Sequence, residues 1–384
     1  DMAFRMTARA DDLKRIDRVI EAGLMGTRAV KLRADVRHRQ STWTVAGLSG
    51  TIGSSELTGW ITARKADGRT RLDGSAHFAR LDFDDLASDA GNAKAIALER
   101  AQGLRLVPNT RINIRKIDAT DGRIAVQVDR VTGGRRPSAI VDLNAVLTLD
   151  DRILTVAPLR LGLKRGAITG KAIVDQRAGQ PKPRVTLALD MRGSRIAALA
   201  GGGKDIDGRV DARVRLTGTG DTIREAVGTS DGTIGLAARS GTLPTKIAAL
   251  IGFDIGTALR GDEQDRSTLR CAVLRLDVRR GVGMADPLII DTSISQSRGV
   301  GTIHFPAEAL ALTLTGAPKT DAALRVPGPV QVGGTIRVPE IRLPAGGSPV
   351  GAVLKAIGRA IAGKKGPTVG DADCGRLVGG AVGG

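Results

Sequence analysis

The residues of this chain that could support acid-base or metal chemistry are few and far apart. His38, His77 and His304 are its three histidines, and none has a cysteine or carboxylate at a ligand spacing such as H-x-x-x-H or C-x-x-C. Asp84 and Asp85 open an expected helical turn, where acidic residues are favourable at the positive end of the helix dipole. We therefore expect ordinary surface or strand histidines and no metal site.

We expect no nucleophile or phosphate-binding motif in the sequence. GTSDG at 228–232 fits the letters of G-x-S-x-G, but we expect no nucleophile elbow there. The GGGK run at 201–204 lacks the Ser or Thr that follows the lysine in a P-loop, and it comes directly after RIAALA, where glycine would end a helix. We expect no enzyme activity and no cofactor.

The two cysteines leave a question that composition alone does not answer. Cys271 lies in STLRCAVLRLDV, and Cys374 lies in GDADCGRL within a glycine-rich tail. An even pair is expected to be bridged in an oxidising compartment, whereas a cytosolic protein would keep two unconnected thiols. A bridge would close a loop of about a hundred residues, for which chain entropy predicts a stabilisation of roughly 4–5 kcal/mol.

The composition indicates a large, basic, aliphatic protein. The chain has 384 residues, 58 Lys and Arg against 40 Asp and Glu, and only 2% aromatic residues with no tyrosine. A charge of +18 raises nucleic acid as a partner. The basic residues are scattered at alternate positions, however, and the aromatic platforms that stack bases are absent. This pattern favours a solvated basic surface or contact with anionic lipid head groups.

No segment of the sequence predicts a membrane span or a signal peptide. No apolar run approaches 18 residues, and DMAFRMTARADD at the start lacks an apolar region. Because the alternating pattern begins within a few residues of Asp1, we expect a fragment that starts inside a longer protein, with any anchor upstream.

Alternation of apolar and polar residues dominates the chain and predicts roughly fifteen half-buried antiparallel strands. The turn-like segments TDGR at 120–123 and LDDR at 149–152 are expected to be hairpin turns. The apolar positions of three segments would share strand faces: Ile124, Val126 and Val128; Leu159, Leu161 and Leu163; and Val185, Leu187, Leu189 and Met191.

Helical patterns are short and few, at 11–24, 195–203, 242–252 and 348–365. The last places an apolar stripe next to lysines and an arginine. This basic amphipathic helix would either touch an anionic membrane or cover the open end of a sheet. Because the stripe is narrow and contains no Trp or Phe, we favour the second role, in which the helix covers the sheet. The stripe consists of Val350, Leu354, Ile357 and Ile361.

An internal repeat organises the strands. Residues 44–68 align without a gap on 155–179, residues 72–87 align on 185–200, and a looser third copy begins at 286–305. A unit of this size cannot cover its own apolar face, so stacked units would share one apolar surface. We divide the chain into a first β-repeat unit with short helices at 1–100, a second at 101–230, and a C-terminal region at 231–384 that holds the terminal helix and the cysteine-containing tail.

The shared surface is either a core filled by its own side chains or an open aliphatic groove. Gly74 and Ala76, beside Leu72 and Phe78, leave volume at inward positions. We expect an elongated, twisted antiparallel sheet with such a groove and a few short covering helices.

Residues 231–377 resemble the C-terminal region of the AsmA family. The resemblance rests on the order of DGTIGLAARSGTLPTKIAALIGFDIGTAL, CAVLRLDVRRGVGMADPLIIDTSISQSRGVGTIHF, LRVPGPVQVGGTIRVPEIRLP and DADC. It implies a β-rich, groove-forming protein of the Gram-negative envelope, held in the inner membrane by an N-terminal helix with the remainder in the periplasm. We expect this chain to be shorter than a full family member, with that anchor upstream of it. In the periplasm, the pair Cys271 and Cys374 would be bridged.

The resemblance implies a role in outer-membrane assembly through phospholipid transport, and no catalytic residue. The functional hypothesis is that the groove shields phospholipid acyl chains, with phospholipid, the inner-membrane surface and outer-membrane assembly proteins as partners. The alternatives are a filled β-scaffold that regulates outer-membrane protein assembly without binding lipid and, less favoured, a basic nucleic-acid binder.

Overall fold

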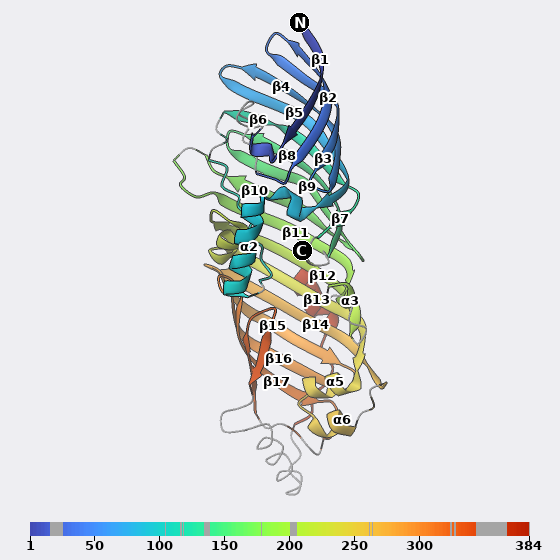
Figure 1. The fold of residues 1–384 in the computed structure, drawn as a ribbon. Coiled ribbons are helices and arrows are strands. Elements are labelled where there is room, and N and C mark those ends of the chain that lie inside the picture. The colour runs from blue at the N-terminus through green and yellow to red at the C-terminus, as the bar shows by residue number, and fades with distance from the viewer. Residues whose placement is uncertain are drawn as a thin grey trace. The chain divides into compact units, whose positions relative to one another are not determined.

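The fold was analysed in a computed structural model, shown in Figure 1. Strands account for 60% of the described residues and helices for 16%, so the expectation of a mainly antiparallel β-protein with few short helices is confirmed. The residues that the structure describes are 1–15, 26–103, 105–115, 117, 119–133, 139–177, 179–199, 206–260, 262, 264–322, 325, 328–342 and 367–383.

The chain forms two compact units. Unit 1 comprises residues 1–189 and 219–226, and unit 2 comprises residues 190–218 and 227–384. The three-region division of the sequence stays a prediction.

Unit 1 contains ten complete strands, and β11 begins in it. Its strands are β1 (Met2–Ala10), β2 (Val30–Arg39), β3 (Thr42–Ile52), β4 (Ser55–Ala66), β5 (Arg69–Asp82), β6 (Thr120–Val128), β7 (Val131–Thr132), β8 (Ile140–Asp150), β9 (Ile153–Leu163), β10 (Ala167–Asp175) and β11 (Arg184–Arg195). Its helices include the 3-10 helix η1 (Phe83–Leu86) and α2 (Asp89–Gln102), while α4 (Ile223–Gly228) begins in unit 1 and ends in unit 2.

Unit 2 repeats the antiparallel pattern. Its strands are β12 (Asp207–Thr219), of which only Thr219 is assigned to unit 1, β13 (Asp231–Pro244), β14 (Arg266–Arg279), β15 (Val282–Thr292), β16 (Ser295–His304), β17 (Ala309–Pro318), β18 (Val330–Gly334) and β19 (Pro339–Arg342). Its helices are α3 (Ile196–Leu199), α5 (Thr245–Ile251), α6 (Ile255–Arg260) and α8 (Cys374–Val382).

The repeat seen in the sequence has a structural counterpart in three β-bulges. Pairing shifts between Val45 and Leu48 in β3, and the same two-residue interruption recurs between Val156 and Leu159 in β9. A third shift lies between Ala285 and Leu288 in β15. Each interruption falls on the Gly-Leu or Pro-Leu step of the repeat, so these residues bend the strand at equivalent places.

Among the described strands, β5 forms parallel pairs with β6 and with the short strand β7, against the sequence expectation. β5 pairs with β6 in parallel, and the chain returns between them through η1 and α2. The segment TDGR at 120–123 therefore begins β6 rather than forming a hairpin turn, because a parallel pair needs a long crossover connection. The turn at Asp151 and Arg152 between β8 and β9 is confirmed.

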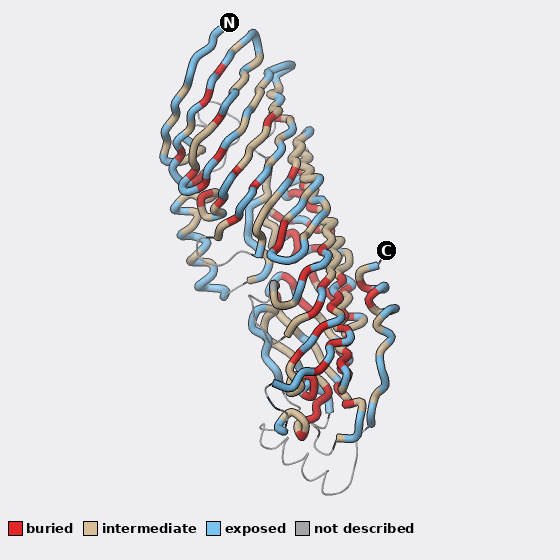
Figure 2. The backbone as a smooth tube through the Cα atoms, turned by 90° about the vertical axis from the view of Figure 1, so that its right-hand side faces the viewer, coloured by how far each residue is buried: buried red, intermediate tan, exposed pale blue. Residues whose placement is uncertain are grey.

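The expected helices at 195–203 and 242–252 correspond in part to α3 and α5. Of the helix expected at 11–24, residues 13–15 are helical, residues 11 and 12 form a bend, and residues 16–24 lie outside the described residues. α2, α4, α6 and α8 were not expected. Figure 2 shows buried and exposed residues alternating along many strands, as the period of two requires.

Candidate functional site

The twelve side chains predicted to line an apolar surface lie on four strands, β5, β6, β9 and β11. Pairing between neighbouring strands places those of β5, β6 and β9 on one face of unit 1. Phe78 is opposite Val128, and Leu161 is joined to them through Leu143 of β8. Five of the twelve are buried: Phe78, Val128, Leu163, Val185 and Met191. The other seven are half-buried: Leu72, Ile124, Val126, Leu159, Leu161, Leu187 and Leu189. Contact with lipid stays a prediction.

A row of aliphatic positions crosses the middle of this face. We call it the unit 1 row, and its members are directly opposite one another in successive pairs on seven strands: Val45, Ile61, Gly74, Ile124, Leu147, Val156 and Ala172. Apart from Gly74, these residues are all half-buried. Residues on the same face of neighbouring strands lie close enough for their side chains to touch, so the row forms a continuous aliphatic surface that is partly accessible.

Unit 2 carries an equivalent row. The unit 2 row crosses seven strands, and each member is directly opposite the next: Ala212, Leu236, Leu274, Leu288, Gly299, Leu314 and Val330. Leu236 is 39% exposed, and Leu274, Leu288 and Leu314 are half-buried. Each row contains one glycine between two large aliphatic residues.

The apolar face of unit 1 is closed at one end of its strands. Phe78 and Val128 belong to a buried cluster with Leu81, and Leu13 and Leu86 pack against it. Asp85 fixes this end, because its Oδ2 accepts hydrogen bonds from the backbone N–H of Ser54 at 2.8 Å and from the hydroxyl of Ser55 at 2.8 Å. Asp85 is thus a buried anchor as well as an acidic residue in a first helical turn.

At the other end of the strands, the same face remains accessible. Phe4 is opposite Val36, which is opposite Val45 of the unit 1 row. Phe4 is 45% exposed and Trp43 is 41% exposed, and the Trp43 ring stacks on His38 with centroids 4.1 Å apart.

The other two histidines lie elsewhere. His77 meets Asp129 at 2.8 Å, and His304 lies 3.3 Å from the Thr302 hydroxyl. The three histidines therefore have separate surroundings.

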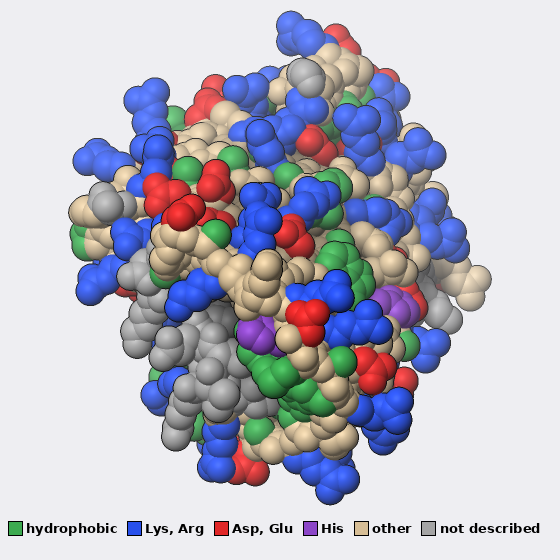
Figure 3. Space-filling model, turned by 90° about the horizontal axis from the view of Figure 1, so that it is seen from above, with side chains coloured by type: hydrophobic (Ala, Val, Ile, Leu, Met, Phe, Trp, Pro, Cys, Tyr) green, Lys and Arg blue, Asp and Glu red, His purple; other side chains and the backbone are tan. Residues whose placement is uncertain are grey.

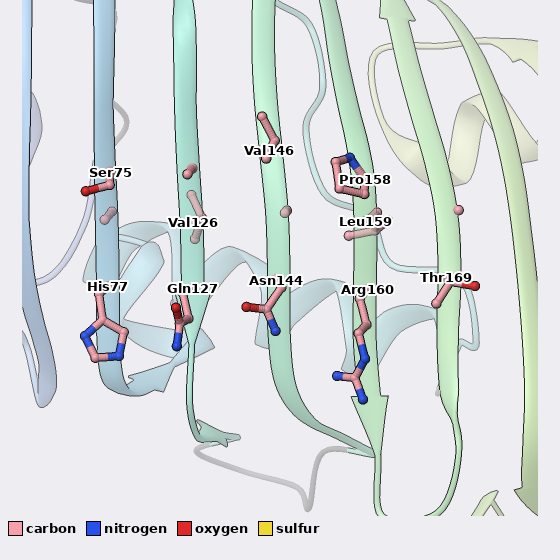
Figure 4. Close-up of a pocket in the computed structure, with 14 residues that line it drawn as sticks. Ser75, His77, Val126, Gln127, Asn144, Val146, Pro158, Leu159, Arg160 and Thr169 are labelled. Carbon is pink, nitrogen blue, oxygen red and sulfur yellow. The ribbon is translucent and has the colours of Figure 1, made fainter.

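A hollow of about 650 Å³ lies over β5, β6, β8, β9 and β10 (Figure 4). His77, Gln127, Asn144 and Arg160 form one row of polar side chains along it, each opposite the next. Val126 and Leu159 also contribute to its wall, and the alternation of each strand places them on the opposite face from the polar row. The sequence did not indicate this polar row, because its members lie on four separate strands.

The expected disulfide is present and holds the C-terminal helix against the sheet. Cys271 of β14 and Cys374 of α8 are bonded across a separation of 103 residues. Val378 and Ala381 of α8 pack with Ala237 into a buried cluster around Cys271. These sheet residues alternate with the unit 2 row, so α8 lies on the opposite face. The tail is an ordered helix capped by the Asp373 carboxylate, which accepts from the N–H of Arg376.

A buried ion-pair network lies beside the disulfide. Asp291 is 0% exposed and lies 2.8 Å from both Arg270 Nε and Lys319 Nζ. Lys319 also meets Asp371 at 2.6 Å, and this contact holds the pKa of the Asp371 carboxyl below its ordinary value. Asp291 comes close to the two sulfurs, but these are bonded to each other and are not free thiolate ligands.

Basic side chains are dispersed rather than gathered. Figure 3 shows Lys and Arg over the face seen from above, with Asp and Glu between them. Several pairs are close, such as Arg69 with Asp121 at 2.6 Å. The predicted stripe of Val350, Leu354, Ile357 and Ile361 and the GGGK run lie outside the described residues. Among the described helices, none is long and apolar enough to cross a membrane.

Comparison with known proteins gives a family and no solved structure. The AsmA family model matches residues 32–287. The chain is 24% identical over 332 residues to AsmA family protein YhjG of Escherichia coli strain K12, an alignment that covers 80% of this chain and 47% of that protein. The chain thus spans about half the length of this curated relative. No solved structure matches. The chain belongs to the AsmA family, whose members are proteins of the bacterial envelope.

Proposed function

We propose that this protein binds phospholipid acyl chains along its apolar sheet faces in the periplasm and so assists lipid supply to the outer membrane. The observation that carries the proposal is the pair of aliphatic rows, each crossing seven strands with most of its side chains half-buried. Family membership supports a role in envelope biogenesis or lipid transfer.

The dimensions of the rows suit acyl chains. Seven strands at a spacing of about 4.8 Å give a row about 29 Å long. The hydrocarbon core of a bilayer is about 30 Å thick, so one leaflet contributes about 15 Å. A row therefore exceeds the length of one acyl chain. Each buried methylene contributes about 0.8 kcal/mol, which allows a continuous aliphatic surface to offset removal of a lipid from its bilayer.

The proposed mechanism is non-covalent and needs no catalytic residue or cofactor. Acyl chains lie against the apolar faces, while head groups stay in water among the dispersed basic side chains. The Cys271–Cys374 disulfide supports an oxidising compartment such as the periplasm. In this proposal, an inner-membrane anchor in the full-length protein and outer-membrane assembly proteins position the faces between donor and acceptor.

Two adjacent residues of β8 give a matched test. Leu147 belongs to the unit 1 row, whereas Val146 is half-buried on the opposite face, where Ala125 is its partner. The protein and the variants Leu147→Glu and Val146→Glu would be purified from membranes and analysed by native mass spectrometry, with circular dichroism to confirm folding. We expect co-purified phospholipid with the unaltered protein and Val146→Glu, and loss of most of it with Leu147→Glu.

A folded, unaltered protein that carries no phospholipid would contradict the proposal, as would equal retention in both variants. The first outcome favours the scaffold alternative, in which another protein covers the apolar faces. Retarded DNA migration at physiological salt would instead support the nucleic-acid alternative.

A further inference from the structure

A second hollow, of about 480 Å³, lies in unit 2 between α8 and strands β12, β13 and the end of β11 from Asp190 on. One of its walls is a single face of α8, because Gly375, Val378, Gly379 and Val382 follow the three- and four-residue spacing of a helix. The sheet wall consists of Asp190, Met191, Arg192, Gly193, Arg209, Asp211, Ala212 and Arg239. Ala212 also belongs to the unit 2 row, but the lipid proposal does not use the charged residues of this hollow.

The two carboxylates of the hollow are already neutralised by arginines. Asp190 accepts hydrogen bonds from Arg213 at 2.9 Å and from Arg215 at 2.6 Å. Although partial burial acts to raise the pKa of Asp190, these guanidinium contacts lower it overall. Asp211 accepts from Arg239 at 2.8 Å. Both carboxylates are therefore engaged by guanidinium groups.

Arg192 and Arg209 remain as exposed arginines in the sheet wall, and no ion pair joins either of them to a described residue. Arg209 is also directly opposite Arg239 in the β12–β13 register. Like charges opposite each other on neighbouring strands are destabilising. An anion between α8 and these strands would offset that repulsion and give both arginines a partner.

The helix wall is fixed and leaves space for such an anion. The disulfide holds the start of α8, and Arg213 and Arg275 donate to the carbonyls of Gly383 and Gly380 near its end. A Cβ added to Gly379 would meet no atom within 4 Å. Packing therefore does not require glycine at this helical position, although glycine is unfavourable in a helix interior.

We propose that the hollow between α8 and β11 to β13 binds a phosphate-bearing anion, with Arg192 and Arg209 as its principal binding residues. The planar guanidinium group donates paired hydrogen bonds that match phosphate geometry. The anion is either free inorganic phosphate or the phosphate of a lipid head group. Ala212 of the unit 2 row also lines the hollow, but Arg209 and Arg239 alternate with the row residues Ala212 and Leu236 and lie on the opposite face, so the proposed anion contacts do not depend on acyl-chain binding.

Two probes distinguish the sources of phosphate. Isothermal titration calorimetry would measure inorganic phosphate, and co-sedimentation would measure vesicles of phosphatidylglycerol against vesicles of phosphatidylcholine. Whichever of these probes the unaltered protein binds, we expect the double variant Arg192→Gln/Arg209→Gln to bind it at least about tenfold more weakly. The control Arg33→Gln/Arg37→Gln removes the same charge from exposed positions of β2 and is expected to retain binding.

A pair of charge-neutral variants separates the site from general electrostatics. Gly379→Leu fills the hollow, whereas Gly380→Leu alters the neighbouring residue, which does not line it and whose added Cβ also meets no atom within 4 Å. We expect loss of binding only with Gly379→Leu. Binding of phosphate alone assigns free phosphate, and binding of phosphatidylglycerol alone assigns a head group. The proposal is overturned if neither probe binds, if the two arginine pairs have equal effects, or if Gly379→Leu binds normally.

Discussion

Leu288 and Leu314 converge over one glycine of the unit 2 row. They lie on β15 and β17, on either side of Gly299 in β16, and the Cδ2 atoms of both occupy the space that a Cβ at Gly299 would need. The glycine thus lets two leucines from strands that are not neighbours come together and form a continuous aliphatic surface.

Substitution of Gly299 should destabilise unit 2. In Gly299→Ala, the added methyl group collides with both leucines, and overpacking of this kind costs about 1–3 kcal/mol. Urea unfolding measures the loss. The control is Gly370→Ala, where a Cβ meets no atom within 4 Å and the expected change is within about 0.5 kcal/mol. Equal unfolding midpoints for the two variants would show that the leucines do not converge in this way.

Removal of the Asp291 carboxylate should be among the most costly single changes near the C-terminal tail. Asp291→Ala leaves Lys319, whose side chain is 11% exposed, with the more exposed Asp371 as its remaining ion-pair partner among the described residues. Breaking a buried pair typically costs about 3 kcal/mol or more. The matched variant Asp277→Ala removes an exposed carboxylate and should change the free energy of unfolding by less than about 1 kcal/mol. Similar losses in both variants would argue against the buried network.

The disulfide should contribute measurably to stability. The bond between Cys271 and Cys374 closes a loop of about a hundred residues, and removal of such bonds typically costs about 2–5 kcal/mol. We expect Cys271→Ala/Cys374→Ala to unfold at lower guanidinium concentration, and reductant to lower the midpoint only in the unaltered protein. A midpoint unaffected by reductant would contradict the bridge.

Acid should lower the free energy of unfolding, partly through protonation of Asp121. The hydrogen bonds from Arg69 hold the pKa of Asp121 below its ordinary value, the N–H of Asp151 adds to this, and partial burial opposes it. A lowered folded-state pKa gives stability that is present above the unfolded pKa of about 4 and is lost as pH falls through the folded-state value.

The difference in unfolding free energy between the unaltered protein and Asp121→Asn should therefore shrink between neutral pH and about pH 3. Urea unfolding at both values measures it. The control Asp67→Asn changes an exposed residue in the turn between β4 and β5, two residues before Arg69. If the difference stayed constant with pH, the Arg69 contact would not depend on ionised Asp121.

The apolar faces were predictable because period-2 alternation is a local signal. Ile124, Val126 and Val128 needed only their own strand to be assigned to one face. The rows themselves were not predictable, because they depend on the bulges at steps such as Ala157 and Pro158, which set the register between strands.

Two other features depend on tertiary contacts that the sequence does not state. The parallel β5–β6 pair requires the crossover through α2, whose start at the Ser88 cap and end at Gly103 were available signals. α8 has three glycines among nine residues and low intrinsic helix propensity, so its order depends on the disulfide and on packing against Ala237. The hollow beside α8 could not be predicted from the sequence either, because it forms only where those contacts hold α8 against the sheet.

Photo-crosslinking on β6 tests the central claim most directly. Ile124 belongs to the unit 1 row, and Ala125 is the exposed neighbour on the opposite face. A benzophenone amino acid placed at either position would be irradiated in cells, and adducts would be identified by mass spectrometry. The proposed function predicts phospholipid adducts at position 124 and few at 125. Equal labelling at both positions, or no lipid adduct at 124 in a folded protein, would contradict it.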